Sequence, residues 1–179
     1  EAIEPTVLWL LKCGVEDGRG QIVGERLFAI HRTGDSYRKS QPYALLDLKP
    51  PEGEVACPQP VREAATDEDR IIEWSLDEVT PGYFGEIENR RRNELGIKEK
   101  YVRKSLQFLI SQSIKKITRF DQQLRDVRDE TDPRRLNIVG NRAKEDARRN
   151  ELSQRLKDRL AEIGQEQHLS EKPPEILGV

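Results

Sequence analysis

The sequence predicts an α+β fold: a small antiparallel β-meander, a short helix and a long antiparallel helical hairpin of coiled-coil type. Strand-like apolar runs separated by turn signals lie within residues 1–48. Residues 83–164 instead carry apolar side chains at heptad spacing. Hydrophobic residues make up 35% of the chain and charged residues 36%. This balance suits long helices, because each buries only a narrow stripe.

The predicted sheet, over residues 1–48, consists of three apolar runs bounded by turn residues. The runs are Val7–Val15, Gln21–His31 and Tyr43–Leu48, and the turns are Asp17–Gly20 and Thr33–Ser36. Three strands with one apolar face need a cover to be stable. We therefore expect a helix from later in the chain, or another part of a larger protein, to pack on them.

A proline-rich linker, residues 49–65, and a short helix, residues 66–79, are expected next. Lys49–Pro60 holds four prolines, and proline blocks both helices and central strands. Thr66–Asp69 has the pattern of a capping box, in which the Thr hydroxyl accepts from a free N–H of the first turn. Thr80–Gly82 should end this helix, and its proline suits the first position of the next one.

The hairpin is predicted over residues 80–165. No proline occurs from Phe84 to Arg128, and about 45 helical residues would span about 65 Å. Apolar positions there step by four and three, with Ser113 as the weak point. This first seam, the stripe along which the helix would pack on its partner, comprises Val102, Leu106, Leu109, Ser113, Ile117, Phe120, Leu124 and Val127.

The second half of the hairpin follows a turn at Asp129–Pro133, where Asp132 caps and Pro133 opens a helix that ends near Gly164. The second seam is expected at Leu136, Val139, Ala143, Ala147, Leu152, Leu156, Leu160 and Ile163, with the alanines allowing close approach. The short turn favours an intramolecular hairpin. An intermolecular coiled coil is the alternative, and the oligomeric state stays open. Residues 166–179 are expected to be a tail.

Charge and composition bound the function. The net charge is −2, divided into −7 for residues 1–80 and +5 for residues 81–179, so the helical half suits an anionic partner or the other half. Two cysteines, Cys13 and Cys57, form no disulfide framework, which indicates a reducing cytoplasm. No apolar run approaches the length of a membrane span. The chain starts with Glu and lacks Met, so we expect a piece of a larger protein.

No catalytic residue and no metal ligand is predicted. The sequence lacks a P-loop, a G-x-S-x-G motif and an H-E-x-x-H motif, and its only histidines are His31 and His168. The glycines of residues 18–24 have the wrong spacing for a nucleotide loop, so we assign them to a turn. The carboxylates of Asp67–Asp69 and Asp129–Asp132 are expected to cap helices and to line a solvated turn.

Basic side chains are the functional candidates. Residues 88–128 hold 12 Lys/Arg against 5 Asp/Glu, and residues 134–159 hold 9 against 4. Such charges along a rod can follow a phosphate backbone, whereas the simpler interpretation is that they keep exposed helices soluble. The candidate nucleic-acid-binding residues are Arg90, Arg91, Arg92, Lys98, Lys100, Arg103, Lys104, Lys115, Lys116, Arg148 and Arg149.

One stretch resembles a known family. Asp17–Ile30 (DGRGQIVGERLFAI), followed by the proline-rich linker and a long Arg/Lys/Glu-rich helical region, resembles the C-terminal part of bacterial Swi/Snf-type helicase-like ATPases. This RapA-like group includes anti-phage defence helicases, in which strand-rich and charged coiled-coil segments follow two RecA-like motor lobes. The resemblance covers about residues 5–165. The motor's own motifs have no counterpart here, so it carries over no catalytic residue.

The resemblance implies a non-catalytic accessory region of a DNA-directed helicase-like ATPase. ATP and Mg²⁺ would then belong to the motor of the parent protein, with no cofactor in this region. The implied partners are double-stranded DNA or RNA, or a protein such as RNA polymerase or another defence subunit. The alternative is a coiled-coil scaffold that binds a protein and has no nucleic-acid role.

Overall fold

The computed structural model describes residues 6–43, 49, 52–53, 56, 58–127 and 132–179. The chain is an α+β protein, as predicted, with a four-stranded antiparallel sheet and two long helices. It divides into two compact units. The first unit comprises Glu1–Arg91 with His168–Val179, and the second comprises Arg92–Gln167.

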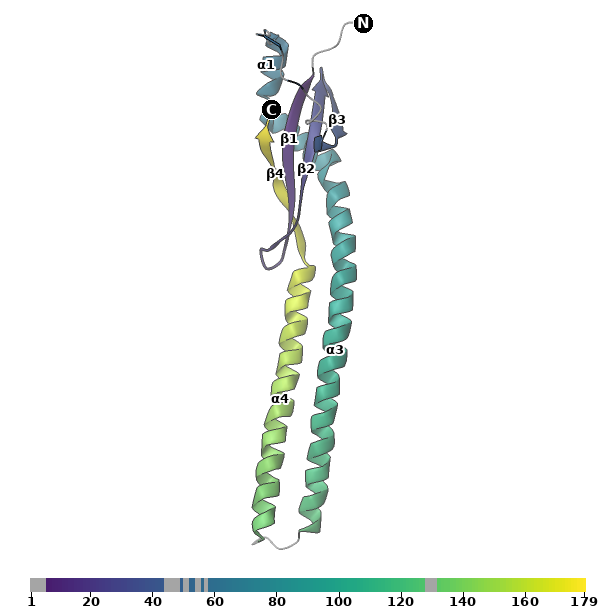
Figure 1. Ribbon diagram of the computed structural model, residues 1–179, viewed down its shortest axis with the longest axis vertical. Helices are drawn as coiled ribbons and strands as arrows, with labels where there is room; N and C mark the ends of the chain where they lie inside the picture. The colour runs from purple at the N-terminus through teal and green to yellow at the C-terminus, as the bar shows by residue number, and fades with distance from the viewer. Residues whose placement is uncertain (1–5, 44–48, 50–51, 54–55, 57, 128–131) are drawn as a thin grey trace. The chain divides into compact units, whose positions relative to one another are not determined.

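The first unit is built on a sheet with the strand order β3-β2-β1-β4 (Figure 1). All neighbouring strands are antiparallel, and β1 lies between β2 and β4. The strands are β1 (Val7–Asp17), β2 (Ile22–Thr33), β3 (Ser36–Ser40) and β4 (Leu169–Gly178). Alternate residues of β1 are fully buried, which explains why this apolar segment forms a strand with one face in the core.

Helices cover that face of the sheet, as expected. They are α1 (Gln59–Ala65), α2 (Glu68–Glu78) and the first turns of α3, which spans Thr80–Asp126. Trp9 pairs with Ile30 and Leu11 with Phe28 across β1 and β2, so these four side chains share one face. The core cluster is Val7, Trp9, Leu11, Cys13, Val15, Phe28, Ile30, Ile71, Val79, Tyr83 and Ile87.

The glycine-containing segment after β1 is a turn, as predicted. The backbone N–H groups of Arg19 and Gln21 donate to Asp17 Oδ1 at 2.9 and 3.1 Å. Gly20 has a φ of 72°, a backbone conformation that side chains with a Cβ disfavour. The turn joins two antiparallel strands, which is not the strand-to-helix setting of a dinucleotide loop.

The third strand differs from its prediction. β3 is Ser36–Ser40, directly after the turn at Gly34, where φ is 57°. The sequence of β3 is polar, so it lacks the apolar run by which the other strands were predicted. An edge strand does not need such a run. Of the predicted strand Tyr43–Leu48, Tyr43 is an exposed residue outside the strands, and residues 44–48 lie outside the described part of the chain.

The predictions of a linker over residues 49–65 and of a capping box at Thr66–Asp69 are both wrong in part. Gln59–Ala65 within the predicted linker is helix α1, with Pro in its first turn, where proline is compatible with a helix. The N-cap of α2 is Asp67, whose side chain makes no capping hydrogen bond to the helix backbone. The Thr66 hydroxyl instead donates to the carbonyl of Glu63 at 2.8 Å. Thr66 therefore closes α1 and does not cap α2.

Residues 166–179 are not a tail. Leu169–Gly178 forms the edge strand β4, which pairs with β1. The register shifts between the pairs Lys12–Glu175 and Gly14–Lys172, where Pro173 and Pro174 lie. Prolines lack the N–H that a central strand must donate, but an edge strand with an irregularity accommodates them.

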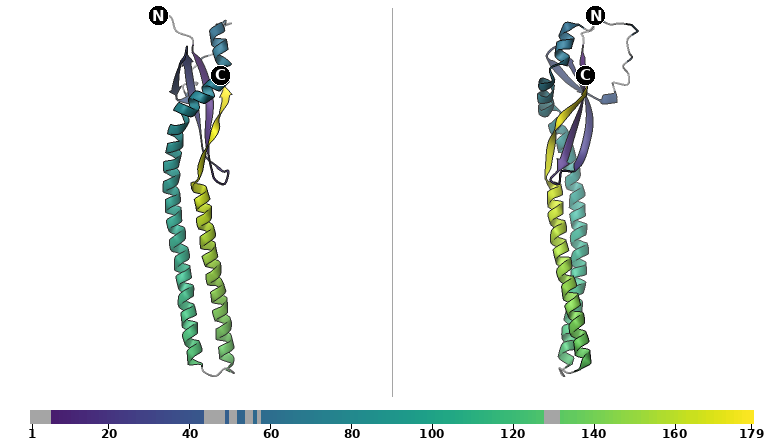
Figure 2. Two further views of the ribbon diagram at one scale, coloured as in Figure 1. Left: turned by 180° about the vertical axis from the view of Figure 1, so that it is seen from behind. Right: turned by 90° about the vertical axis from the view of Figure 1, so that its left-hand side faces the viewer.

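The second unit is the predicted intramolecular hairpin. α3 and α4 (Pro133–Gln167) lie side by side in both views of Figure 2. Asp132 caps α4 as predicted, since Asp132 Oδ1 accepts from the backbone N–H of Arg134 at 2.8 Å; residues 128–131 lie outside the described part. α4 passes Gly164 and continues to Gln167. Every residue of the first seam is buried or half-buried.

The second seam is only half correct. Leu152, Leu156, Leu160 and Ile163 are buried or half-buried, but Leu136, Val139, Ala143 and Ala147 are exposed. Between Pro133 and Arg149, the half-buried residues of α4 are instead mostly polar: Arg135, Ile138, Arg142, Glu145 and Asp146. Arg142 Nε donates to Asp121 Oδ1 at 2.5 Å, and Arg135 donates to the carbonyl of Val127 at 2.7 Å. Toward the turn, α4 therefore contributes mainly polar side chains to the hairpin, while the first seam of α3 remains apolar.

Candidate nucleic-acid interface

Two of the predicted basic residues hold the first unit together. Arg90 donates to the carbonyl of Val23 on β2 at 2.9 Å. Arg91 forms an ion pair with the buried carboxylate of Asp17 at 3.7 Å. The neighbouring Arg92, in the second unit, is exposed but also takes part in an interaction within the chain. All three arginines therefore already make interactions within the chain, which leaves them less available to an external ligand.

Four further candidates form ion pairs within the second unit. Lys98 contacts Glu166 at 2.7 Å and Lys116 contacts Glu145 at 3.5 Å, each joining α3 to α4. Arg103 pairs with Glu99 one turn away on α3, and Arg149 pairs with Asp146 on α4. A cation that already pairs with a carboxylate attracts a phosphate less strongly. These four residues are therefore weaker candidates for nucleic-acid contact than the sequence suggested.

The remaining candidates are open to solvent. Lys100, Lys104 and Lys115 on α3 are exposed, and none has an ion pair or hydrogen bond within the part of the chain that the structure describes. Arg148 on α4 is exposed and lies near Glu145, whose pKa its charge helps to lower. The structure therefore leaves four of the predicted residues available for an external partner.

A groove in the hairpin adds two arginines that sequence reasoning missed. It has a volume of about 330 Å³ and is lined by Tyr101, Val102, Ser105, Leu106, Arg155 and Arg159. Arg155 is exposed and has no ion pair or hydrogen bond among the described residues. Arg159 pairs with Glu162 on its own helix.

The signal that could have found them is helical spacing. Residues 144, 148, 155 and 159 are separated by four, seven and four positions, which places them on one side of a helix. We call Lys144, Arg148, Arg155 and Arg159 the arginine face. All four side chains are exposed on α4.

Near the middle of the hairpin, a polar layer occupies the predicted weak point. The buried Ser113 hydroxyl donates to Glu145 Oε1 at 2.7 Å, and Lys116 lies 3.5 Å from Glu145 Oε2. The Ser113 hydrogen bond lowers the pKa of Glu145 below its usual value of 4.5, and Lys116 and Arg148 act in the same direction. A paired polar group inside a seam can set the register of two helices.

Substituting Ser113→Ala is expected to destabilise the hairpin by about 1–2 kcal/mol at neutral pH, because a poorly hydrated carboxylate loses its donor. Since the folded-state pKa of Glu145 is lowered, its contribution is present above the unfolded pKa and disappears as pH falls through the folded pKa. Urea unfolding at pH 7 and pH 3 should therefore show a smaller cost in acid. Ser111→Ala, an exposed serine on the same helix, is the matched control; an equal cost at both pH values would contradict the assignment.

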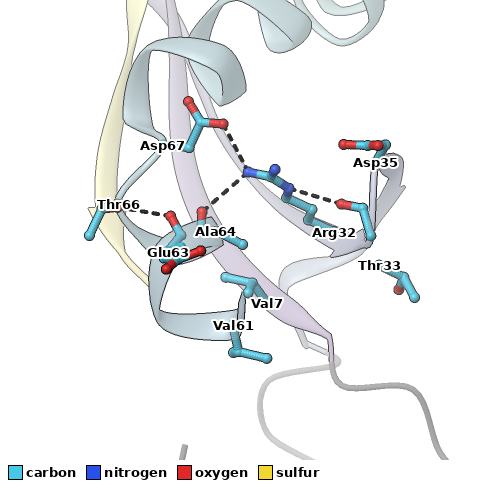
Figure 3. Close-up of a pocket in the computed structure, with 10 residues that line it drawn as sticks. Val7, Arg32, Thr33, Asp35, Val61, Glu63, Ala64, Thr66 and Asp67 are labelled. Carbon is cyan, nitrogen blue, oxygen red and sulfur yellow. Dashed lines mark hydrogen bonds and ion pairs between the residues drawn. The ribbon is translucent and has the colours of Figure 1, made fainter. Parts of the chain in front are cut away.

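A hollow of about 820 Å³ in the first unit is lined by Arg32 and residues of α1 and the β2–β3 turn (Figure 3). Arg32 donates to the carbonyls of Gly34 and Ala64 at 3.1 and 3.3 Å. It also pairs with Asp67 at 3.1 Å. Figure 3 shows these bonds converging on one guanidinium. Arg32 thus ties α1 and the start of α2 to the sheet, which is a structural role.

The other sequence candidates for chemistry occupy ordinary positions. Burial raises the pKa of the Cys13 thiol, which keeps it protonated inside the core. Within the described residues, no group of His, Cys, Asp and Glu side chains could hold a metal ion. None of the helices in that part of the chain is both long and apolar enough to cross a membrane.

Comparison with known proteins adds no further constraint: no family model, curated protein or solved structure matches this chain. The hairpin's charges and exposed side chains are the features of the chain that bear on its function.

Proposed function

We propose that this chain is a non-catalytic accessory region of a DNA-directed helicase-like ATPase, whose helical hairpin contacts nucleic acid in the cytoplasm. The observation that carries the proposal is the charge of the second unit. Residues 92–167 hold 19 Lys/Arg and 13 Asp/Glu, a net charge of +6. The resemblance of residues 17–30 and the segments after them supplies the parent class. ATP and Mg²⁺ would act in its motor.

The arginine face is the best-placed contact surface for a phosphate backbone. Lys144 and Arg159 lie fifteen residues apart on α4, which corresponds to about 22 Å of helix. That length matches about six base pairs of duplex DNA at about 3.4 Å per pair. Glu151, Asp158 and Glu162 lie on the same helix, so we expect moderate affinity without sequence preference.

Binding to labelled double-stranded DNA, followed by fluorescence anisotropy between about 50 and 200 mM salt, tests the proposal. Four cations predict a slope of log Kobs against log salt near −3.6, whereas all eleven sequence candidates would give about −10. The double substitution Arg155→Gln with Arg159→Gln should halve the slope and weaken binding about tenfold. Labelled duplex RNA in the same assay decides which nucleic acid is preferred.

The matched control is Lys157→Gln, which removes an exposed cation from α4 outside the arginine face. It should change the affinity less than about twofold, because the removed charge lies away from the contact surface. Absence of DNA and RNA binding at low salt would overturn the proposal and leave the charges as features that keep the helices soluble.

A second candidate function is a scaffold that binds a protein and has no nucleic-acid role. One observation favours it: Ile97, Tyr101 and Phe108 of α3 are 59%, 71% and 61% exposed. Large apolar side chains gathered on one exposed helix face are typical of protein-binding surfaces.

A further inference from the structure

Three exposed apolar residues of α3, Ile97, Tyr101 and Phe108, share a regular pattern of positions with three exposed polar residues. Positions 97, 101, 104, 108, 111 and 115 are separated by alternating steps of four and three, the spacing of a coiled-coil seam. We call these six residues the outer stripe: Ile97, Tyr101, Lys104, Phe108, Ser111 and Lys115, all of them exposed.

Most of the outer stripe faces away from α4, and Tyr101 lies at its margin, where it also lines the groove with Arg155 and Arg159. At about 100° per residue, positions 97, 104, 108 and 115 fall within about 40° of one another. Leu95, Leu106 and Ser113 fall about 180° away, and these three are buried. α3 therefore carries two seams at heptad spacing, and α4 fills only one.

The composition of the outer stripe restricts what could fill the second seam. Ile97, Tyr101 and Phe108 are apolar, while Lys104 and Lys115 place positive charges at two seam positions. Neither lysine has an ion pair or hydrogen bond among the described residues. A lysine at a seam position costs stability unless the partner offers a carboxylate, and so it selects the partner and its register.

We propose that the outer stripe binds an acidic amphipathic helix of a partner protein. The partner places apolar side chains against Ile97, Tyr101 and Phe108, and carboxylates about 16 Å apart against Lys104 and Lys115. This inference goes beyond the nucleic-acid contact and rests on the second candidate function. It reassigns Lys104 and Lys115 from phosphate contacts to protein recognition.

Two other occupants fit less well. A second copy packed in parallel would place Lys104 against Lys104 and Lys115 against Lys115, and like charges in a seam repel. A phosphate backbone would meet the lysines but would leave the apolar side chains in water. An acidic amphipathic helix can cover the apolar side chains of the outer stripe and also pair with its two lysines.

The test uses two synthetic helical peptides of about four heptads, with Leu at the a and d positions. One carries Glu at the e and g positions and the other carries Lys there. Each labelled peptide is titrated with the full chain and followed by anisotropy. The acidic peptide should bind at least about tenfold more tightly than the basic peptide, because it complements the two lysines.

Substitutions then identify the surface. Ile97→Ser with Phe108→Ser should weaken both peptides at least about tenfold, because the apolar contacts are lost. Lys104→Glu with Lys115→Glu should invert the preference in favour of the basic peptide. Leu136→Ser is the matched control, since Leu136 is 75% exposed on α4, and it should leave both affinities within about twofold. Circular dichroism should show all variants folded.

Several outcomes would overturn the inference. Equal affinity for the two peptides would show that Lys104 and Lys115 do not select an acidic partner. Unchanged peptide binding by the Phe108 variant would show that the outer stripe is not the binding surface. Dimerisation of the chain in sedimentation equilibrium, abolished by Phe108→Ser, would assign the outer stripe to a second copy. A loss of DNA binding in the Phe108 variant would assign it to nucleic acid. Failure of the nucleic-acid proposal is read separately, from DNA binding by the wild-type chain.

Discussion

Substituting Leu106→Asp is expected to open the helical hairpin. Leu106 lies in the first seam and is 8% exposed, in the apolar part of the hairpin that also contains Leu156 and Ile163. The substitution removes a buried side chain and places a charge without a partner in its position. The expected cost is about 3–5 kcal/mol. Thermal unfolding followed by the circular dichroism of the helices measures the loss.

Leu136→Asp provides the control for that experiment. Both substitutions introduce the same charge into a long helix of the hairpin, but Leu136 is 75% exposed. We expect a change of at most about 0.5 kcal/mol at this position. If Leu106→Asp and Leu136→Asp had the same small effect, the packing of α3 against α4 would not stabilise the chain in solution, and an intermolecular coiled coil would have to be reconsidered.

Substituting Gly24→Ala is expected to destabilise the first unit by about 1–3 kcal/mol. A Cβ at this position of β2 would lie 2.7 Å from Ile87 Cδ1 and 2.7 Å from Tyr83 Oη. Both side chains belong to the core that joins the sheet to α3, and Ile87 is almost completely buried. Both side chains are almost completely buried in a closely packed core, so either they or the strand and helix must shift to make room for the methyl group. Urea unfolding measures the loss.

Gly85→Ala is the matched control, since it lies in α3 between Tyr83 and Ile87 and a Cβ there meets no atom within 4 Å. Alanine favours a helix over glycine by about 1 kcal/mol, so this variant should gain stability. A loss at Gly85 as large as that at Gly24 would show that the close approach of β2 to α3 is not the cause.

Sequence reasoning succeeded where a structure depends on neighbouring residues. The apolar run Val7–Val15, with a turn signal after it, predicted β1, and the four-and-three spacing of Val102–Val127 predicted the buried side of α3. Asp132 and Pro133 marked the start of α4 by local hydrogen bonding and by a fixed φ. Each of these signals acts over one strand or a few helical turns, so it can be read without knowing the rest of the fold.

The candidate site was predicted less well, because charge alone does not reveal pairing. Lys98 and Lys115 are equivalent in the sequence, yet Lys98 meets Glu166 across the hairpin and Lys115 stays open to solvent. Arg155 was missed although it lines the groove with Tyr101. Whether a cation remains available depends on which carboxylate the opposite helix places beside it.

By itself, then, the sequence determined the α+β class, the strands β1 and β2, the two long helices and the start of the second helix at Asp132 and Pro133. Only the tertiary structure decided that Leu169–Gly178 is an edge strand, that Arg142 and Glu145 replace Leu136 and Val139 at the interface, and which lysines stay open. Local periodicity and capping act within one segment. Edge pairing, helix rotation and ion pairing depend on a partner distant in the chain, and side-chain spacing within one segment carries no information about that partner.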